Sequence, residues 1–153
     1  KSSIDRWLET QESHGATIDN KPSKQNASKK ILLIDDDDLV LRAMTKFLER
    51  EGFIIICARN GPEALAKVKE ASFDLIIVDV KMPGINGIET IKRIRELLSK
   101  DNRPGVPEIV ITGYMDAETE RQAQKLGITD YIYKPFSIGD FVKTVNNKKA
   151  GRF

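Results

Sequence analysis

Several residue types are scarce in this chain of 153 residues, and each scarcity excludes a class of protein. There is one cysteine, Cys57, so an internal disulfide framework is excluded. Cys57 lies in the apolar run "FIIICA", where a small buried hydrophobic residue is expected. There is also one histidine, His14, which lies in a polar stretch. We interpret it as a solvated side chain rather than a phosphodonor or a metal ligand.

Long apolar runs and an excess of one charge are also missing. No apolar stretch approaches the length of a membrane span, and no secretory signal is visible, so we predict a cytoplasmic protein without membrane contacts. Lys and Arg number 25 and Asp and Glu number 23. This balance argues against a nucleic-acid module held by bulk charge. The composition, 40% hydrophobic and 31% charged, predicts one globular domain plus some tail.

The first 29 residues differ from the rest. Ile4, Trp7 and Leu8 fall at positions i, i+3 and i+4, which predicts a short amphipathic helix, and "HGATIDNKPSKQNASKK" is typical of a polar linker. We interpret the helix as the end of an upstream domain, with a dimerisation or docking helix as the alternative. The predicted division is a short helix and linker at 1–29, a domain at 30–147 and a basic tail at 148–153.

From residue 30 onward, short apolar runs and amphipathic segments alternate five times. Strands are predicted at 30–35, 53–58, 73–80, 107–112 and 130–133. Helices are predicted at 39–51, 62–71, 88–100, 116–126 and 137–147. The middle runs are continuously apolar and rich in β-branched residues, so helices are expected to cover both faces of the sheet. Right-handed crossovers then give an α/β fold with an open, doubly wound five-stranded parallel sheet.

Polar residues follow four of these strands, at the rim where functional groups gather in such a sheet. They are Asp35 and Asp36, Asp79, Thr112 with Gly113, and Lys134 with Pro135. Three carboxylates would repel one another in an empty pocket, whereas a divalent cation such as Mg²⁺ would make the pocket favourable. In "ILLIDDDDLVL", Asp37 and Asp38 precede a predicted helix and are expected to cap it.

The segments "LLIDD", "LIIVDVKMPGINGIE", "IVITG" and "DYIYKPF", in this order, closely resemble the receiver domain of bacterial two-component response regulators. The resemblance covers roughly residues 29 to 147. It implies a flavodoxin-like (βα)5 fold with strand order 2-1-3-4-5. It also implies a phosphoacceptor signalling domain that catalyses only its own phosphorylation and dephosphorylation.

The resemblance assigns a role to each acid at the rim. Asp79 is expected to accept a phosphoryl group from a phosphohistidine of a sensor histidine kinase or a histidine phosphotransfer protein. The cofactor is expected to be Mg²⁺, bound by Asp36, Asp79 and the backbone carbonyl of Lys81. Asp35 would contribute through a water molecule.

The resemblance also implies a switch. Lys134 is expected to contact the phosphoryl group, and its peptide bond to Pro135 is expected to be cis. Thr112 would bond the phosphoryl oxygen, Gly113 would leave room beside it, and Tyr131 would turn inward on activation.

Two further side chains are expected to tune the rate of dephosphorylation. Lys81 lies two residues past Asp79, and Tyr114 lies two residues past Thr112. In the family these two positions vary and influence self-hydrolysis. A long cation and a large aromatic ring can exclude water, so the pair predicts slow loss of the phosphoryl group.

Two other interpretations are weighed against this one. A haloacid-dehalogenase-type phosphatase would use Asp35 as nucleophile and Asp37 as second acid of a D-x-D-x-[TV] motif. Leu39 stands where Thr or Val is expected, and Asp79 would have no role. A receiver fold that acts as a non-phosphorylated interaction module is the other alternative, although all residues of the acceptor site are present.

Two outputs of the signal are open: the protein acts by docking alone, or it belongs to a longer parent chain. Seventeen residues follow Phe136, too few for a DNA-binding helix pair or a catalytic domain, so no direct nucleic-acid contact is expected. The N-terminal helix and linker favour a parent chain such as a larger regulator or a hybrid kinase. Contact with the kinase is expected around Leu39 and Arg42, and a phosphorylation-dependent dimer is left open.

Overall fold

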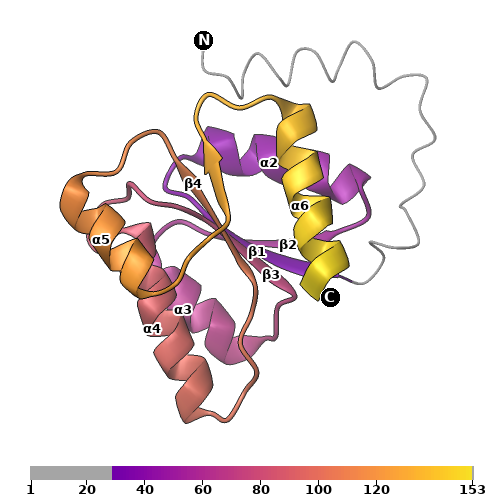
Figure 1. Cartoon of the computed structure of the whole chain (residues 1–153). Helices are drawn as coiled ribbons and strands as arrows, with labels where there is room; N and C mark the ends of the chain where they lie inside the picture. Colours follow the sequence, from indigo (N-terminus) through magenta and orange to yellow (C-terminus); the bar gives the residue numbers. More distant parts are fainter. Residues whose placement is uncertain (1–28, 153) are drawn as a thin grey trace, which may run out of the picture.

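A five-stranded parallel sheet forms the centre of the structure, a computed structural model that describes residues 29–152 (Figure 1). The strands are β1 (Lys30–Ile34), β2 (Ile54–Ala58), β3 (Leu75–Asp79), β4 (Glu108–Thr112) and β5 (Tyr131–Tyr133). They pair in the order β2-β1-β3-β4-β5, which confirms the predicted fold and strand order. The predicted N-terminal helix and all of the linker except Lys29 lie outside the described residues.

Helices cover both faces of this sheet, as the apolar strands predict. On one face lie α2 (Asp38–Arg50) and α6 (Ile138–Arg152), whose buried side chains join one core cluster. On the other face lie α3 (Gly61–Glu70), α4 (Gly87–Lys100) and α5 (Ala117–Lys125), which join a second cluster. The two groups of helices flank the sheet in Figure 1.

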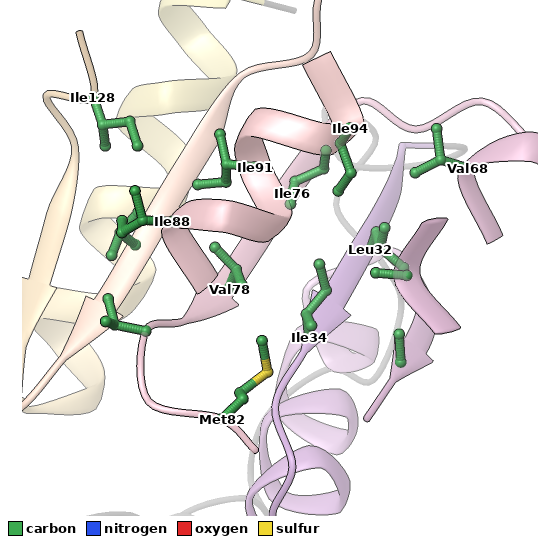
Figure 2. Close-up of a cluster of buried hydrophobic side chains, with 14 of the residues drawn as sticks. Leu32, Ile34, Val68, Ile76, Val78, Met82, Ile88, Ile91, Ile94 and Ile128 are labelled. Atoms are coloured by element: carbon green, nitrogen blue, oxygen red, sulfur yellow. The ribbon is translucent and has the colours of Figure 1, made fainter. Parts of the chain in front are cut away.

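Successive residues of each strand point to opposite faces, and this divides the core in two. In β1, Ile31 and Leu33 belong to the cluster under α2 and α6, whereas Leu32 and Ile34 belong to the other. Figure 2 shows the second cluster, with the β-branched side chains of β3 beside those of α4. Because both faces are covered, all five residues of β3 are buried, which accounts for its continuous apolar run.

Four helices begin with a polar side chain that accepts hydrogen bonds from the free N–H groups of the first turn. These caps are Asp37 for α2, Asn60 for α3, Asn86 for α4 and Asp116 for α5. Asp37 accepts from Leu39 N at 2.9 Å and from Val40 N at 3.4 Å, as predicted for this acid. Each cap starts its helix at the carboxyl rim of the sheet, so the loops of the rim are fixed where each helix begins.

The last helix is longer than the sequence predicts. It continues to Arg152, past the predicted end at residue 147 and into the segment interpreted as a tail. The sequence "NNKKAGR" carries no large apolar residue, so helical periodicity cannot be seen there, and Asn and Gly are weak helix formers. Among the described helices, none is both long and apolar enough to cross a membrane.

Candidate functional site

Three carboxylates converge at the carboxyl rim of the sheet. Asp79 is the last residue of β3, and Asp35 and Asp36 directly follow β1, which pairs with β3. One oxygen from each side chain lies within 4.8 Å of the others. Asp35 and Asp79 are 3% and 6% exposed, whereas Asp36 faces solvent. The sequence predicted this convergence, because neighbouring parallel strands end at the same rim.

Burial and mutual repulsion make two of these acids unusually weak. Burial raises the pKa of Asp35 to about 7, and the charges of Asp79 and Asp36 act in the same direction. An N–H from Asp37, 3.0 Å from Asp35 Oδ1, opposes part of this rise. Burial also raises the pKa of Asp79, and the charge of Asp36 adds to the effect. An acidic cluster with raised pKa values is a site that gains from a cation.

The other two acids of the run "DDDD" have different partners. Asp37 caps α2, so its carboxylate is committed to backbone N–H groups. Asp38 lies in the first turn of the helix, where an acid suits the helix dipole, and pairs with the Arg59 guanidinium at the end of β2. The four consecutive acids thus divide into two at the cluster and two at the helix start, as predicted.

Lys134 brings a positive charge to the same rim. Its Nζ lies 3.6 Å from Asp79 Oδ1, and its backbone N–H donates to the Thr112 carbonyl at 2.9 Å. Its charge lowers the pKa of Asp79 and so offsets part of the rise caused by burial. The peptide bond from Lys134 to Pro135 is cis. This cation therefore lies beside the acid that the sequence predicts as the phosphoacceptor.

Thr112 ends β4 with a buried hydroxyl. The residue is 2% exposed, and within the described part of the chain its Oγ1 is the buried side-chain oxygen left without a hydrogen-bond partner. A buried hydroxyl with no partner is costly, so an incoming oxygen acceptor would be favoured there. Gly113 follows, and a Cβ at Gly113 would make only ordinary contact with the Lys134 side chain, at 3.8 Å.

The two side chains expected to shield the acceptor are on the surface. Lys81 is exposed, and its backbone N–H donates to the Asp79 carboxylate. The Tyr114 side chain is 77% exposed. Both side chains can therefore change rotamer, and no surrounding side chains in the described part of the chain hold either of them over Asp79.

Tyr131 lies at the start of β5 and is half-buried against the cluster under α3, α4 and α5. Its hydroxyl donates to the Ile128 carbonyl at 3.1 Å. Its ring stacks on Tyr133, with 6.0 Å between ring centroids and 20° between ring planes. Sequence reasoning singled out Tyr131 but not Tyr133, although residues two apart on a strand share a face.

A second residue that sequence reasoning left without a role is Gly87, the first residue of α4. A Cβ at this position would collide with the backbone carbonyl of Asp79. The Gly87 N–H also donates to the Val80 carbonyl at 2.8 Å, which closes the loop that follows Asp79. Only a glycine lets α4 start this close to β3. The two glycines of the quoted segment "LIIVDVKMPGINGIE" are a signal for such an approach, but their spacing alone does not say which glycine makes the close contact.

The donor set fits a magnesium ion. Mg²⁺ prefers a few carboxylate oxygens, water and a phosphate oxygen, and three carboxylates that repel one another meet at this rim. Thr112 ends β4 and Lys134 directly follows β5, so the hydroxyl and the ammonium lie at the same rim, where they suit an anion next to the cation.

Comparison with known proteins identifies the family. Residues 31–146 match the family described as the response regulator receiver domain. The chain belongs to this family. The receiver domain is a signalling domain of two-component systems, so the resemblance in the sequence is confirmed. The haloacid-dehalogenase-type interpretation loses its support, and Asp37, its second acid, is committed as a helix cap.

Curated relatives agree with this assignment. The chain is 40% identical over 121 residues to the transcriptional regulatory protein ResD of Bacillus subtilis. The aligned segment covers 79% of this chain and 48% of ResD. The chain is also 38% identical over 112 residues to the transcriptional regulatory protein CrdR of Helicobacter pylori. That aligned segment covers 73% of this chain and 51% of CrdR. The chain thus spans about half the length of these relatives.

Solved structures show the same fold. A CheY-like receiver domain protein from Methanospirillum hungatei superposes with a TM-score of 0.73 at 31% identity, covering 81% of this chain and 95% of that one. The match runs through nearly the whole neighbour, so the receiver fold accounts for the described residues.

Proposed function

We propose that this receiver domain takes a phosphoryl group onto Asp79 from a phosphohistidine and uses it as a signal. An Asp79 carboxylate oxygen attacks the phosphorus as the bond from phosphorus to the imidazole nitrogen breaks, and the electron pair returns to that nitrogen. The observation that carries the proposal is the cluster of three carboxylates within 4.8 Å, with Lys134 at 3.6 Å from Asp79. Positioning and charge neutralisation are what phosphoryl transfer requires.

Asp36, Asp79 and the backbone carbonyl of Lys81 would hold Mg²⁺, with Asp35 acting through a water molecule. When bound, Mg²⁺ offsets the negative charge of the phosphoryl oxygens. Lys134 supplies the second positive charge from the end of β5, and its charge opposes the rise in the pKa of Asp79 that burial causes. Gly113 adds no side chain beside the phosphoryl group.

The signal would be read through Thr112 and Tyr131. A phosphoryl oxygen gives the Thr112 hydroxyl the acceptor that it otherwise lacks, and the hydroxyl moves toward Asp79. The Tyr131 ring then turns into the space that Thr112 leaves. This movement reshapes the surface of α5, β5 and α6, where output or relay partners would dock. Ligands shift such an equilibrium only by their differential affinity for the two states, so the energy gap must be small.

The lifetime of the phosphorylated state would depend on Lys81 and Tyr114. Water must attack the phosphorus opposite the bond to Asp79, and these two exposed side chains flank that approach. A long cation and a large ring can cover the phosphoryl group and exclude water. We therefore propose slow self-dephosphorylation, which suits a relay or a slow output.

The phosphodonor would be a sensor histidine kinase or a histidine phosphotransfer protein. Leu39 is 47% exposed at the start of α2, beside the acidic cluster, and Arg42 is exposed one turn further along. This part of α2 is the proposed docking surface. ResD and CrdR are named transcriptional regulatory proteins and are about twice as long as the matched segment, which supports a parent chain with an output domain joined to the receiver unit at 30–147.

Incubation with Mg²⁺ and a small phosphodonor such as acetyl phosphate tests the proposal. One phosphoryl group should be added, and hydroxylamine and base should remove it, as they remove an acyl phosphate. Addition of no phosphoryl group, or of a group stable to hydroxylamine, would contradict it.

A further inference from the structure

Tyr133 lies next to both residues of the proposed switch. In the pairing of β4 with β5, Tyr133 is the register partner of Thr112, and Tyr131 is the register partner of Val110. Residues that are paired across parallel strands, or two apart on one strand, share a face of the sheet. Thr112, Tyr131 and Tyr133 therefore share the face that α3, α4 and α5 cover.

Two contacts hold Tyr131 in the conformation seen in this structure. Its hydroxyl donates to the Ile128 carbonyl, in the loop before β5. Its ring stacks on the ring of Tyr133 with 6.0 Å between centroids and planes 20° apart. Aromatic pairs at separations of roughly 4.5–7 Å with offset rings attract each other beyond the area that they bury.

Turning Tyr131 toward Thr112 breaks both contacts. A change of χ1 moves a side chain between staggered positions roughly 120° apart, which takes the Tyr131 ring off the face of Tyr133. Tyr133 itself is 63% exposed, so no surrounding side chains among the described residues force its ring to move together with that of Tyr131. The stack is an interaction of the conformation seen in this structure, and an interaction made in one of two states shifts the balance between them.

We infer that Tyr133 is a positioning residue that holds Tyr131 outward and lowers the population of the activated receiver before phosphorylation. This inference rests on the switch proposed above and adds to it a residue that sets its resting balance. A ring at position 133 lowers the activated fraction of the unphosphorylated protein, so that activation requires the phosphoryl group. The apparent affinity for a phosphoryl mimic is proportional to the fraction of protein in the competent state. Loss of the stack should increase this fraction and so raise the apparent affinity.

The test compares Tyr133→Leu with Tyr133→Phe. The chain has three tyrosines, so ¹³C-labelled tyrosine rings give a simple spectrum in which Tyr131 is assigned by its loss in Tyr131→Phe. In Tyr133→Leu the Tyr131 ring signals should lose the shift caused by the neighbouring ring and move toward those of the activated state. Half-saturation by beryllofluoride with Mg²⁺ should occur at a concentration about two- to tenfold lower, the range expected for one aromatic pair. Tyr133→Phe keeps the ring and should match the wild type in both measurements.

Equal Tyr131 spectra and equal half-saturation in Tyr133→Leu and the wild type would overturn the inference while leaving the proposed function intact. So would a shift of the same size in Tyr133→Phe, because the ring would then not be the cause. If wild-type protein binds no beryllofluoride, or Asp79→Asn binds it equally well, the proposed function fails and this inference fails with it. Tyr133 is largely exposed, so both variants should fold, and thermal melts confirm this before the comparison.

Discussion

Lys134 Nζ lies 3.6 Å from Asp79 Oδ1, so the cation at the end of β5 is paired with the acid at the end of β3. The pair has opposite consequences for the two charges that the site is proposed to receive. Lys134 attracts a phosphoryl group and repels a metal cation. Removing it should therefore separate metal binding from phosphorylation.

In Lys134→Gln, phosphorylation by acetyl phosphate at saturating Mg²⁺ should slow by about a hundredfold, the scale of one lost charge-stabilising donor. Mg²⁺ should bind more tightly than to the wild type, because a repelling charge is gone. Mg²⁺ titration and phosphorylation kinetics check the two effects, and Lys92→Gln, an exposed lysine on α4, is the control. Weaker Mg²⁺ binding in Lys134→Gln would contradict the arrangement proposed here.

The exposed acid Asp36 should contribute to Mg²⁺ binding and not to the stability of the metal-free protein. Without metal, Asp36→Ala should be at least as stable as the wild type, because it removes repulsion from Asp35 and Asp79. Mg²⁺ at a hundred times its dissociation constant should stabilise the wild type by about 2.7 kcal/mol and the variant by little. Thermal melts with and without Mg²⁺ test this, with Glu96→Gln on α4 as the control. Equal Mg²⁺ shifts in Asp36→Ala and the wild type would count against Asp36 as a ligand.

The raised pKa of Asp35 predicts a pH dependence of stability without metal. The ordinary pKa of Asp is 3.8, and burial raises that of Asp35 to about 7. Between these values the folded state binds more protons than the unfolded state, so the contribution of Asp35 to stability falls as pH rises from 3.8 to about 7.

Asp35→Asn removes this ionisation and keeps an oxygen for the Asp37 N–H. The free energy of unfolding of the wild type, relative to the variant, should therefore be lower at about pH 7.5 than at about pH 5. Urea unfolding in the absence of Mg²⁺ at the two pH values is the measurement. A difference that stays constant, or that increases with pH, would show that Asp35 is ionised throughout.

The proposed shielding by Lys81 and Tyr114 predicts a slow decay of the phosphorylated protein. The double variant Lys81→Asn with Tyr114→Glu should lose its phosphoryl group faster, because small or acidic side chains admit and orient water. The decay rate after removal of the phosphodonor, in excess Mg²⁺, checks this, and Lys92→Gln again serves as control. A double variant that decays no faster than the wild type would show that the two side chains do not shield Asp79.

Much of this structure could be predicted from the sequence, because hydrophobic patterning determines which face of each element is buried. The five strands and the convergence of Asp35, Asp36 and Asp79 follow from alternating strands and helices that end at one rim. The strand order comes from the resemblance to receiver domains, because alternation alone does not fix it. Asp37 as a cap follows from its place before an amphipathic run.

What could not be predicted depends on contacts between elements. The collision that excludes a side chain at Gly87 arises from the distance between α4 and β3, which no pattern within either segment encodes. The shared face of Tyr131 and Tyr133 follows from strand periodicity, but their stacking depends on the side-chain rotamers. The extension of α6 to Arg152 lies in a polar segment, which has no apolar residues at helical spacing to indicate a helix.

The most direct test of the central claim is the mass of the intact protein after incubation with acetyl phosphate and Mg²⁺. We predict one added phosphoryl group in the wild type, which hydroxylamine removes, and none in Asp79→Asn. Asp35→Asn should still be phosphorylated, although more slowly. The same hydroxylamine-sensitive addition in Asp79→Asn, or its loss in Asp35→Asn alone, would contradict the assignment of Asp79 as the acceptor.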